Sequence, residues 1–135
     1  MVTLDTNVAV YAVSEEPKRL RARAVLKLAN FASVQVLNEY ARTAQRKLRR
    51  EWSEIGKDLD LLRAAVPDIR PIDVNAHRDA VRIAERYKLQ FFDALMIAVA
   101  LKNGATILYS EDMQHGLVID EKLTITNPFL PTDSA

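Results

Sequence analysis

Four acidic residues of this 135-residue chain have positions at which they could do chemistry together: Asp5, Glu39, Asp93 and Asp112. Asp5 and Asp112 follow predicted strands, Asp93 lies at the start of a predicted buried helix, and Glu39 lies on a predicted amphipathic helix. Asp5 directly follows the short apolar segment 2–4, and Asp112 comes three residues after the apolar segment 106–109. The carboxyl ends of neighbouring parallel strands meet at one edge of a sheet, so Asp5 and Asp112 are expected to lie close together. Clustered carboxylates repel one another, and a magnesium site with two or three carboxylates would keep them ionised.

Each acid also has an ordinary structural interpretation. Asp5 could cap the helix that follows it, and Asp93 could be a first-turn acid that interacts favourably with the helix dipole. Glu39 could pair with Arg42 three residues further on, and Asp112 could be a turn residue. Asp93 opens an otherwise nearly apolar segment, however, and Asp5 follows a buried strand. A shared metal site therefore explains the acids together better than four separate roles do.

The composition limits which metal could bind. The chain has no cysteine, which excludes thiolate metal sites and cysteine nucleophiles. It has only two histidines, so a zinc site with several histidines from one chain is not expected. Any metal would be held by oxygen atoms of the 18 Asp and Glu residues, which indicates a hard cation, Mg²⁺ or Mn²⁺.

The elements that must position these acids alternate between strands and helices. Short apolar runs predict strands at 2–4, 69–72, 106–109 and 123–126, and a link or short strand at 31–33. Helical periodicity predicts helices at 7–13, 18–30, 34–48, 52–66, 74–87 and 92–102. This alternation predicts an α/β fold with a mostly parallel sheet. Residues 1–130 are expected to form a single domain, followed by a flexible tail at 131–135.

The basic residues are unevenly spread although the formal net charge is only +1. Ten basic residues and two acidic ones lie between positions 16 and 50. This asymmetry favours a basic face that meets a polyanion, and a pair of solvated helix faces is the open alternative. The longest apolar run, 94–101, has eight residues, whereas a membrane helix needs about 20. The N-terminus has no basic leader, so a cytoplasmic protein without a membrane span is expected.

The segments around the acids together resemble a known family. The segments are Leu4-Asp5-Thr6-Asn7, Val36-Leu37-Asn38-Glu39-Tyr40, Phe92-Asp93-Ala94-Leu95, Tyr109-Ser110-Glu111-Asp112 and Asn127-Pro128-Phe129. In this order and at these spacings, over residues 1 to about 130, the chain resembles the PIN-domain ribonucleases. Within them it is similar to the VapC-type toxins of type II toxin–antitoxin pairs.

The resemblance implies a PIN-like three-layer α/β/α fold and assigns roles to the site residues. The family's acidic quartet falls on Asp5, Glu39, Asp93 and Asp112. Of these, Asp5, Asp93 and Asp112 would hold one or two Mg²⁺ or Mn²⁺ ions, and Glu39 would be a ligand or orient a bound water. Two supporting residues match as well: Asn7 as the polar residue near the first acid, and Ser110 as the hydroxyl that helps to order the site. Glu111 is an extra acid that could share or replace the metal role of Asp112.

The implied activity is that of a metal-dependent endoribonuclease, in which a metal-activated water attacks the RNA phosphate. Arg42, Arg46 and Arg49 would contact the RNA backbone. His115 could also touch RNA, with an ordinary loop histidine as the alternative. The implied partners are the RNA substrate, a cognate antitoxin that covers the acidic cleft, and a second copy of the chain in a homodimer.

Two other function classes fit the residues less well. A non-catalytic PIN-like module that binds RNA or a partner would be expected to have lost an acid, whereas the quartet is complete. A phosphate-accepting receiver needs an acidic pair near the N-terminus and a lysine after a late strand. Here the N-terminal acid is single, and no such lysine follows a strong strand.

Overall fold

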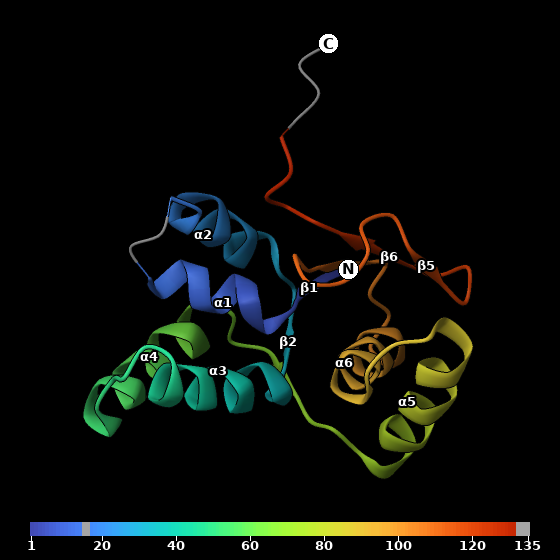
Figure 1. Ribbon diagram of the computed structural model, residues 1–135, viewed down its shortest axis with the longest axis horizontal. Helices are drawn as coiled ribbons and strands as arrows, with labels where there is room; N and C mark the ends of the chain where they lie inside the picture. The colour runs from blue at the N-terminus through green and yellow to red at the C-terminus, as the bar shows by residue number, and fades with distance from the viewer. Residues whose placement is uncertain (15–16, 132–135) are drawn as a thin grey trace.

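The computed structural model describes residues 1–14 and 17–131 (Figure 1). The tail predicted at 131–135 lies outside the described residues, apart from Pro131. The described helices are α1 (Thr6–Val13), α2 (Arg19–Leu28), α3 (Val34–Arg46), α4 (Trp52–Ala65), α5 (Val74–Tyr87) and α6 (Phe91–Lys102). The described strands are β1 (Val2–Leu4), β2 (Ala32–Ser33), β3 (Ile69–Arg70), β4 (Ile107–Tyr109), β5 (Val118–Ile119) and β6 (Leu123–Thr126). All six predicted helices are confirmed, with ends that differ by at most two residues.

The helix ends follow ordinary capping chemistry. The carboxylate of Asp73 accepts a hydrogen bond from the Ala76 N–H at 2.8 Å and so begins α5. Glu51 and Glu54 form a reciprocal capping box at the start of α4. Gly104, with a φ of +80°, is a left-handed residue just after α6, a position that favours glycine.

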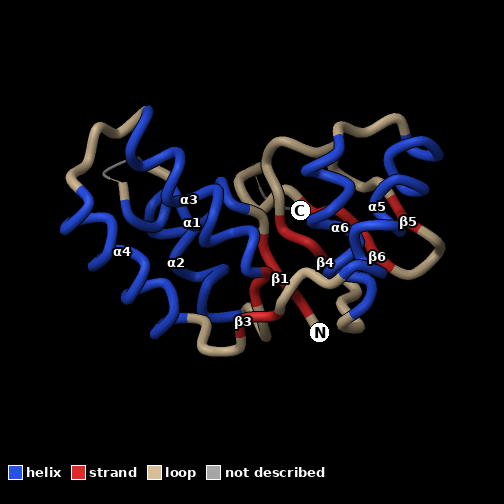
Figure 2. Tube along the Cα trace, turned by 90° about the horizontal axis from the view of Figure 1, so that it is seen from below, coloured by secondary structure: helices blue, strands red, loops and turns tan. Residues whose placement is uncertain are grey.

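The main sheet has the strand order β1-β4-β6-β5 and is mostly parallel (Figure 2). β1 pairs with β4, and β4 with β6, in parallel, whereas β5 is antiparallel to β6. Sequence analysis missed β5, because two residues are too few to show a period. Its turn to β6 also carries no glycine: Asp120 and Glu121 take the positive φ angles of 51° and 58°.

A second, parallel pair of strands lies beside β1 (Figure 2). β2 pairs with β3, and the residues leading into β2 run along β1: the Asn30 N–H donates to the Val2 carbonyl at 2.9 Å. The Thr3 hydroxyl donates to the Phe31 carbonyl at 2.7 Å. The predicted strand 69–72 is shorter than expected, because Pro71 has no N–H with which to extend the ladder.

The helices cover the strands from two sides, which confirms the expected three-layer α/β/α architecture. The first four helices lie together on one side, and α5 packs against α6 on the other (Figures 1 and 2). Residues 94–100 of α6 are all buried, as the apolar run predicts. Among the described residues, no helix combines the length and the apolar character that a membrane crossing requires.

A buried polar cluster joins α3 to the middle of α4. The Asp58 carboxylate accepts two hydrogen bonds from the Arg50 guanidinium, at 2.6 and 2.8 Å, and a third from the Tyr40 hydroxyl at 2.7 Å. Asp58 and Tyr40 are both buried. Burial, followed by the hydrogen bond to Asp58, raises the pKa of the Tyr40 hydroxyl. The cluster therefore fixes the helix that carries Glu39.

This cluster makes a testable contribution to stability. Asp58→Ala leaves the buried Tyr40 hydroxyl without an acceptor and is expected to lower the free energy of unfolding by about 1–3 kcal/mol. Tyr40→Phe leaves the Arg50 bonds in place and should cost about 0.5–1.5 kcal/mol. Urea denaturation measures both changes. The control is Asp60→Asn on the same helix, where an exposed ion pair is worth about 0–1 kcal/mol. Equal losses for Asp58→Ala and Asp60→Asn would contradict this role.

Candidate active site

Asp5 lies at the carboxyl end of β1 and at the N-terminus of α1. Its backbone N–H donates to the Tyr109 carbonyl at 2.8 Å, so the sheet itself places the residue. One carboxylate oxygen accepts from the Thr6 N–H at 2.7 Å, and the other accepts from the Ser110 hydroxyl at 2.8 Å. The side chain therefore caps α1, as its structural interpretation predicts, and also meets Ser110 across the sheet. The residue is only 5% exposed.

Burial raises the pKa of Asp5 from its usual 3.8 to about 7. The hydrogen bonds from Ser110 and Thr6 oppose this shift, whereas the nearby charges of Asp93 and Glu39 add to it. A carboxylate in this position stays ionised at neutral pH more readily when a cation is bound close by.

Glu39 reaches the same region from α3. It accepts a hydrogen bond from the Thr6 hydroxyl at 2.6 Å and one from the Gln35 side-chain amide at 3.2 Å. The side chain is thus oriented by two donors. Glu39 and Arg42, both among the described residues, form no ion pair, so the pairing considered for them is wrong.

Asp93 and Asp112 complete the acidic set. Asp93 is a half-buried residue in the first turn of α6. Burial raises its pKa, a hydrogen bond with Gln90 opposes the rise, and the charges of Asp112 and Glu39 add to it. Asp112 is exposed in the turn after β4, where the Met113 N–H donates to the Ser110 hydroxyl oxygen at 3.3 Å.

One cleft is lined by all four predicted acids. Its other lining residues are Thr6, Asn7, Val10, Tyr11, Thr43, Lys47, Leu48 and Gln90. The side-chain oxygen of Asn7 accepts from the Glu111 N–H at 3.4 Å, and its buried amide nitrogen has no hydrogen-bond partner among the described residues. Since carboxylate and amide oxygens are the ligands that hard divalent cations prefer, the cleft fits Mg²⁺ or Mn²⁺. No three acids or histidines of the described segments stand close enough to form a ready-made metal cluster, so the acids surround an open cleft.

Glu111 is held away from this cleft. Its carboxylate accepts from the Tyr11 hydroxyl at 2.6 Å and forms an ion pair with Lys18. Burial alone would raise its pKa, but the hydrogen bonds from Lys18 and Tyr11 outweigh burial and lower it. Glu111 does not line the cleft, whereas its neighbour Asp112 does.

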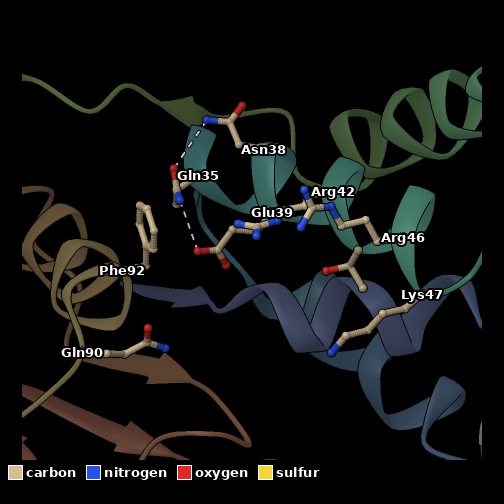
Figure 3. Close-up of a pocket in the computed structure, with 9 residues that line it drawn as sticks. Gln35, Asn38, Glu39, Arg42, Arg46, Lys47, Gln90 and Phe92 are labelled. Atoms are coloured by element: carbon tan, nitrogen blue, oxygen red, sulfur yellow. Dashed lines mark hydrogen bonds between the residues drawn. The ribbon is translucent and has the colours of Figure 1, made fainter.

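A basic groove adjoins the acidic cleft (Figure 3). We use the name for the hollow lined by Gln35, Asn38, Glu39, Arg42, Thr43, Arg46, Lys47, Gln90 and Phe92. The groove and the cleft share Glu39, Thr43, Lys47 and Gln90. Two of the three arginines predicted to contact RNA therefore line a hollow that leads directly to the acids.

The other two predicted RNA contacts lie elsewhere. Arg49 is exposed, has a φ of 54°, and lines neither the groove nor the cleft. His115 is also exposed and outside both linings, and its Nδ1 accepts from the Asn127 N–H at 2.9 Å. This bond ties the loop of His115 to the end of β6, which is the ordinary loop role considered for it.

Sequence analysis missed the residues that orient the acids. Thr6 and Gln35 each donate a hydrogen bond to Glu39, and Gln90 forms a hydrogen bond with Asp93. The signals were weak: Thr6 sits between two matched residues, Gln35 is one helical turn before Glu39, and Gln90 immediately precedes the buried helix. Lys47, which lines both hollows, could have been found from its spacing of one residue from Arg46.

The fold and the acidic cleft together define a class of protein. The family model of the PIN domain matches residues 2–117, and the chain belongs to the PIN-domain family. A comparison with curated protein sequences found no match.

Solved structures are similar to the chain at low sequence identity. A toxin–antitoxin complex from Klebsiella pneumoniae has a TM-score of 0.73 at 18% identity, covering 96% of this chain and 98% of that one. VapC20 of Mycobacterium tuberculosis, a toxin that cleaves the sarcin-ricin loop, has a TM-score of 0.68 at 17% identity, covering 83% and 90%. FitAcB from Neisseria gonorrhoeae has a TM-score of 0.62 at 16% identity, covering 95% and 98%. These likenesses show a shared fold.

The raised pKa of Asp5 predicts how stability depends on pH. The folded protein holds the Asp5 proton more tightly than the unfolded chain does, so ionisation of Asp5 lowers stability as pH rises from 3.8 to about 7. Asp5→Asn removes this cost and should raise the free energy of unfolding above pH 7 by up to about 4 kcal/mol, with little change at pH 4.

Urea denaturation in EDTA at several pH values measures the effect. Asp60→Asn, on the exposed face of α4, serves as the control and should show no such trend. A difference between wild type and Asp5→Asn that is the same at pH 4 and pH 8 would contradict the raised pKa.

Proposed function

We propose that this chain is a metal-dependent endoribonuclease and the toxin of a toxin–antitoxin pair, with residues 1–130 acting as one PIN-like domain in the cytoplasm. The observation that carries the proposal is the convergence of four acids, from four separate segments of the chain, on one cleft beside a basic groove. Membership of the PIN-domain family supports it. So does the likeness of its fold to that of a toxin that cleaves the sarcin-ricin loop and to that of a toxin–antitoxin complex.

Asp5, Asp93 and Asp112 are the residues that would hold Mg²⁺ or Mn²⁺. Such an ion, when bound, stabilises negative charge on the phosphate and makes water more acidic. The two hydrogen bonds on Asp5, from Thr6 and Ser110, fix the orientation of its carboxylate. Asp112 is exposed and lines the cleft together with Asp5 and Asp93.

Glu39 would act on the attacking water. Because Thr6 and Gln35 each donate to its carboxylate, Glu39 is held in place to accept a hydrogen bond from a water in the cleft. Arg42, Arg46 and Lys47 would bind the phosphates on either side of the cut.

An antitoxin would inhibit by covering the cleft, with a cationic side chain among the carboxylates. Exposed apolar side chains on α2, Leu20 and Leu28, offer a surface for the antitoxin or for a second copy in a homodimer.

Cleavage of a mixed RNA pool tests the proposal. The purified protein is expected to cut RNA in Mg²⁺ or Mn²⁺ and not in EDTA. Because loss of an outer-shell group typically costs 10–100-fold, loss of a metal ligand in Asp93→Asn or Asp112→Asn should lower the rate by at least about 100-fold.

The matched control is Glu111→Gln, next to Asp112 in the chain but outside the cleft lining. It should keep most of the wild-type rate, and its amide can still accept from Tyr11. If Glu111→Gln were as inactive as Asp112→Asn, the assignment of Asp112 as the ligand would be wrong. If a folded wild type cut no class of RNA, the alternative of a non-catalytic module that binds RNA or a partner would replace the proposal.

Salt dependence tests the basic groove separately. Each phosphate contact with single-stranded nucleic acid contributes a slope of about −0.7 to the plot of log affinity against log salt. Arg46→Ala should therefore make the slope less negative by about 0.7, measured by fluorescence anisotropy with labelled RNA in EDTA. Arg78→Ala, an exposed arginine on α5, should leave the slope unchanged. Equal slopes for wild type and Arg46→Ala would remove Arg46 from the RNA path.

A further inference from the structure

Phe92 is a large aromatic side chain that is exposed to solvent next to the acids proposed to be catalytic. It lies in the first turn of α6, directly before Asp93, and is 48% exposed. The seven residues 94–100 that follow on the same helix are all buried. The hydrophobic core therefore does not account for the position of this ring.

The Phe92 ring packs against a second aromatic ring, that of Phe91. Its centroid lies 5.7 Å from that of Phe91, with an angle of 66° between the planes, and Phe91 meets His77 in the same edge-to-face manner at 5.1 Å. Edge-to-face contacts of this kind are the preferred arrangement of aromatic pairs. They hold the Phe92 side chain in place while it lines the basic groove.

The opposite wall of the groove is polar. Figure 3 shows the Phe92 ring facing Gln35 of α3, with Asn38 and Glu39 on the same helix. The cationic side chains Arg42, Arg46 and Lys47 follow further along α3 and at its end. None of the three forms an ion pair with another residue of the described ranges 1–14 and 17–131.

These surroundings match a single strand of nucleic acid. Cations along one wall would bind the phosphates, and an aromatic ring would accept the face of a base. Glu39 lines the same groove, and the other three acids line the cleft that adjoins it. A base within an A-form duplex has its faces covered by its neighbours, so only an unpaired base can stack on a protein ring.

We propose that Phe92 is the stacking platform for an unpaired nucleobase next to the phosphate that is cut. The inference rests on the proposed function and adds to it a residue that positions one base of the substrate. Base stacking on an aromatic side chain changes affinity by about 5- to 150-fold.

Cleavage kinetics test the platform. Two RNAs of the same sequence are compared, one with the cut site in a loop and one with it fully paired. Wild type is expected to cut the loop and to leave the paired site nearly uncut. Phe92→Ala should raise KM for the loop by about 5- to 150-fold, with a smaller change in kcat. Phe92→Trp should keep the wild-type KM, and Trp52→Ala, at an exposed aromatic on α4, should change neither constant.

Fluorescence gives a readout that a merely structural role would not move. Trp52 is the only tryptophan of the chain, so the double variant Trp52→Phe/Phe92→Trp carries its single tryptophan in the groove. Stacking should quench its emission when unpaired RNA is added in EDTA, and duplex RNA should quench it much less. This measurement also decides the question if Phe92→Ala fails to fold.

Three outcomes would overturn the platform. One is an unchanged KM for folded Phe92→Ala while wild type cuts RNA, which leaves the proposed nuclease function standing. The second is loss of antitoxin binding or of dimer formation in Phe92→Ala without any change in KM, which would make the ring a protein contact. The third is equal cutting of the paired and looped sites. A wild type that cuts no RNA would instead overturn the proposed function itself.

Discussion

The site depends on one constraint: a carboxylate, that of Asp5, is buried at the edge of the sheet with other carboxylates close to it. Burial and the charges of Asp93 and Glu39 both oppose its ionisation, and only the donors on Thr6 and Ser110 favour it. The register that pairs Leu4 with Tyr109 places Ser110 next to Asp5. The parallel sheet thus positions both the acid and the hydroxyl that holds it. Repulsion among the carboxylates therefore remains in the cleft, and a bound cation would relieve it.

Helix α3 connects the acidic cleft to the rest of the molecule through two consecutive residues. Glu39 points into the cleft and is held by Thr6, whereas Tyr40 points away from it and donates to the buried Asp58. Consecutive residues on a helix face in directions about 100° apart, so one element serves both purposes. The polar cluster of Tyr40, Arg50 and Asp58 therefore fixes the position and the rotation of α3, and with them the place of Glu39 beside the other acids.

The sequence predicted the helices and the convergence of the acids well, because long amphipathic runs and strand ends leave strong patterns. It did not predict β5, which is two residues long, or the position of β2 beside β1, which depends on side-chain bonds such as Thr3 to Phe31. The spacing from Ser110 favoured Asp112 over Glu111, but the sequence left open whether Glu111 shares the metal role. The two acids are adjacent, and only the packing of Lys18 and Tyr11 separates them. Arg49 illustrates a related difficulty, since a left-handed backbone angle just after α3 moves its side chain out of helical register. The catalytic and metal-binding roles of the acids remain predictions.

The burial of residues 94–100 in α6 separates a part of the molecule that tolerates few substitutions from a part that tolerates many. A charge placed anywhere along residues 94–100 would enter the core, so the helix that begins with Asp93 accepts few changes. The groove wall formed by Asn38, Arg42 and Arg46 contributes almost nothing to the core and is free to change. During evolution, descendants of such a chain can acquire new substrates by altering one face of α3, while the chemistry is inherited together with the packing.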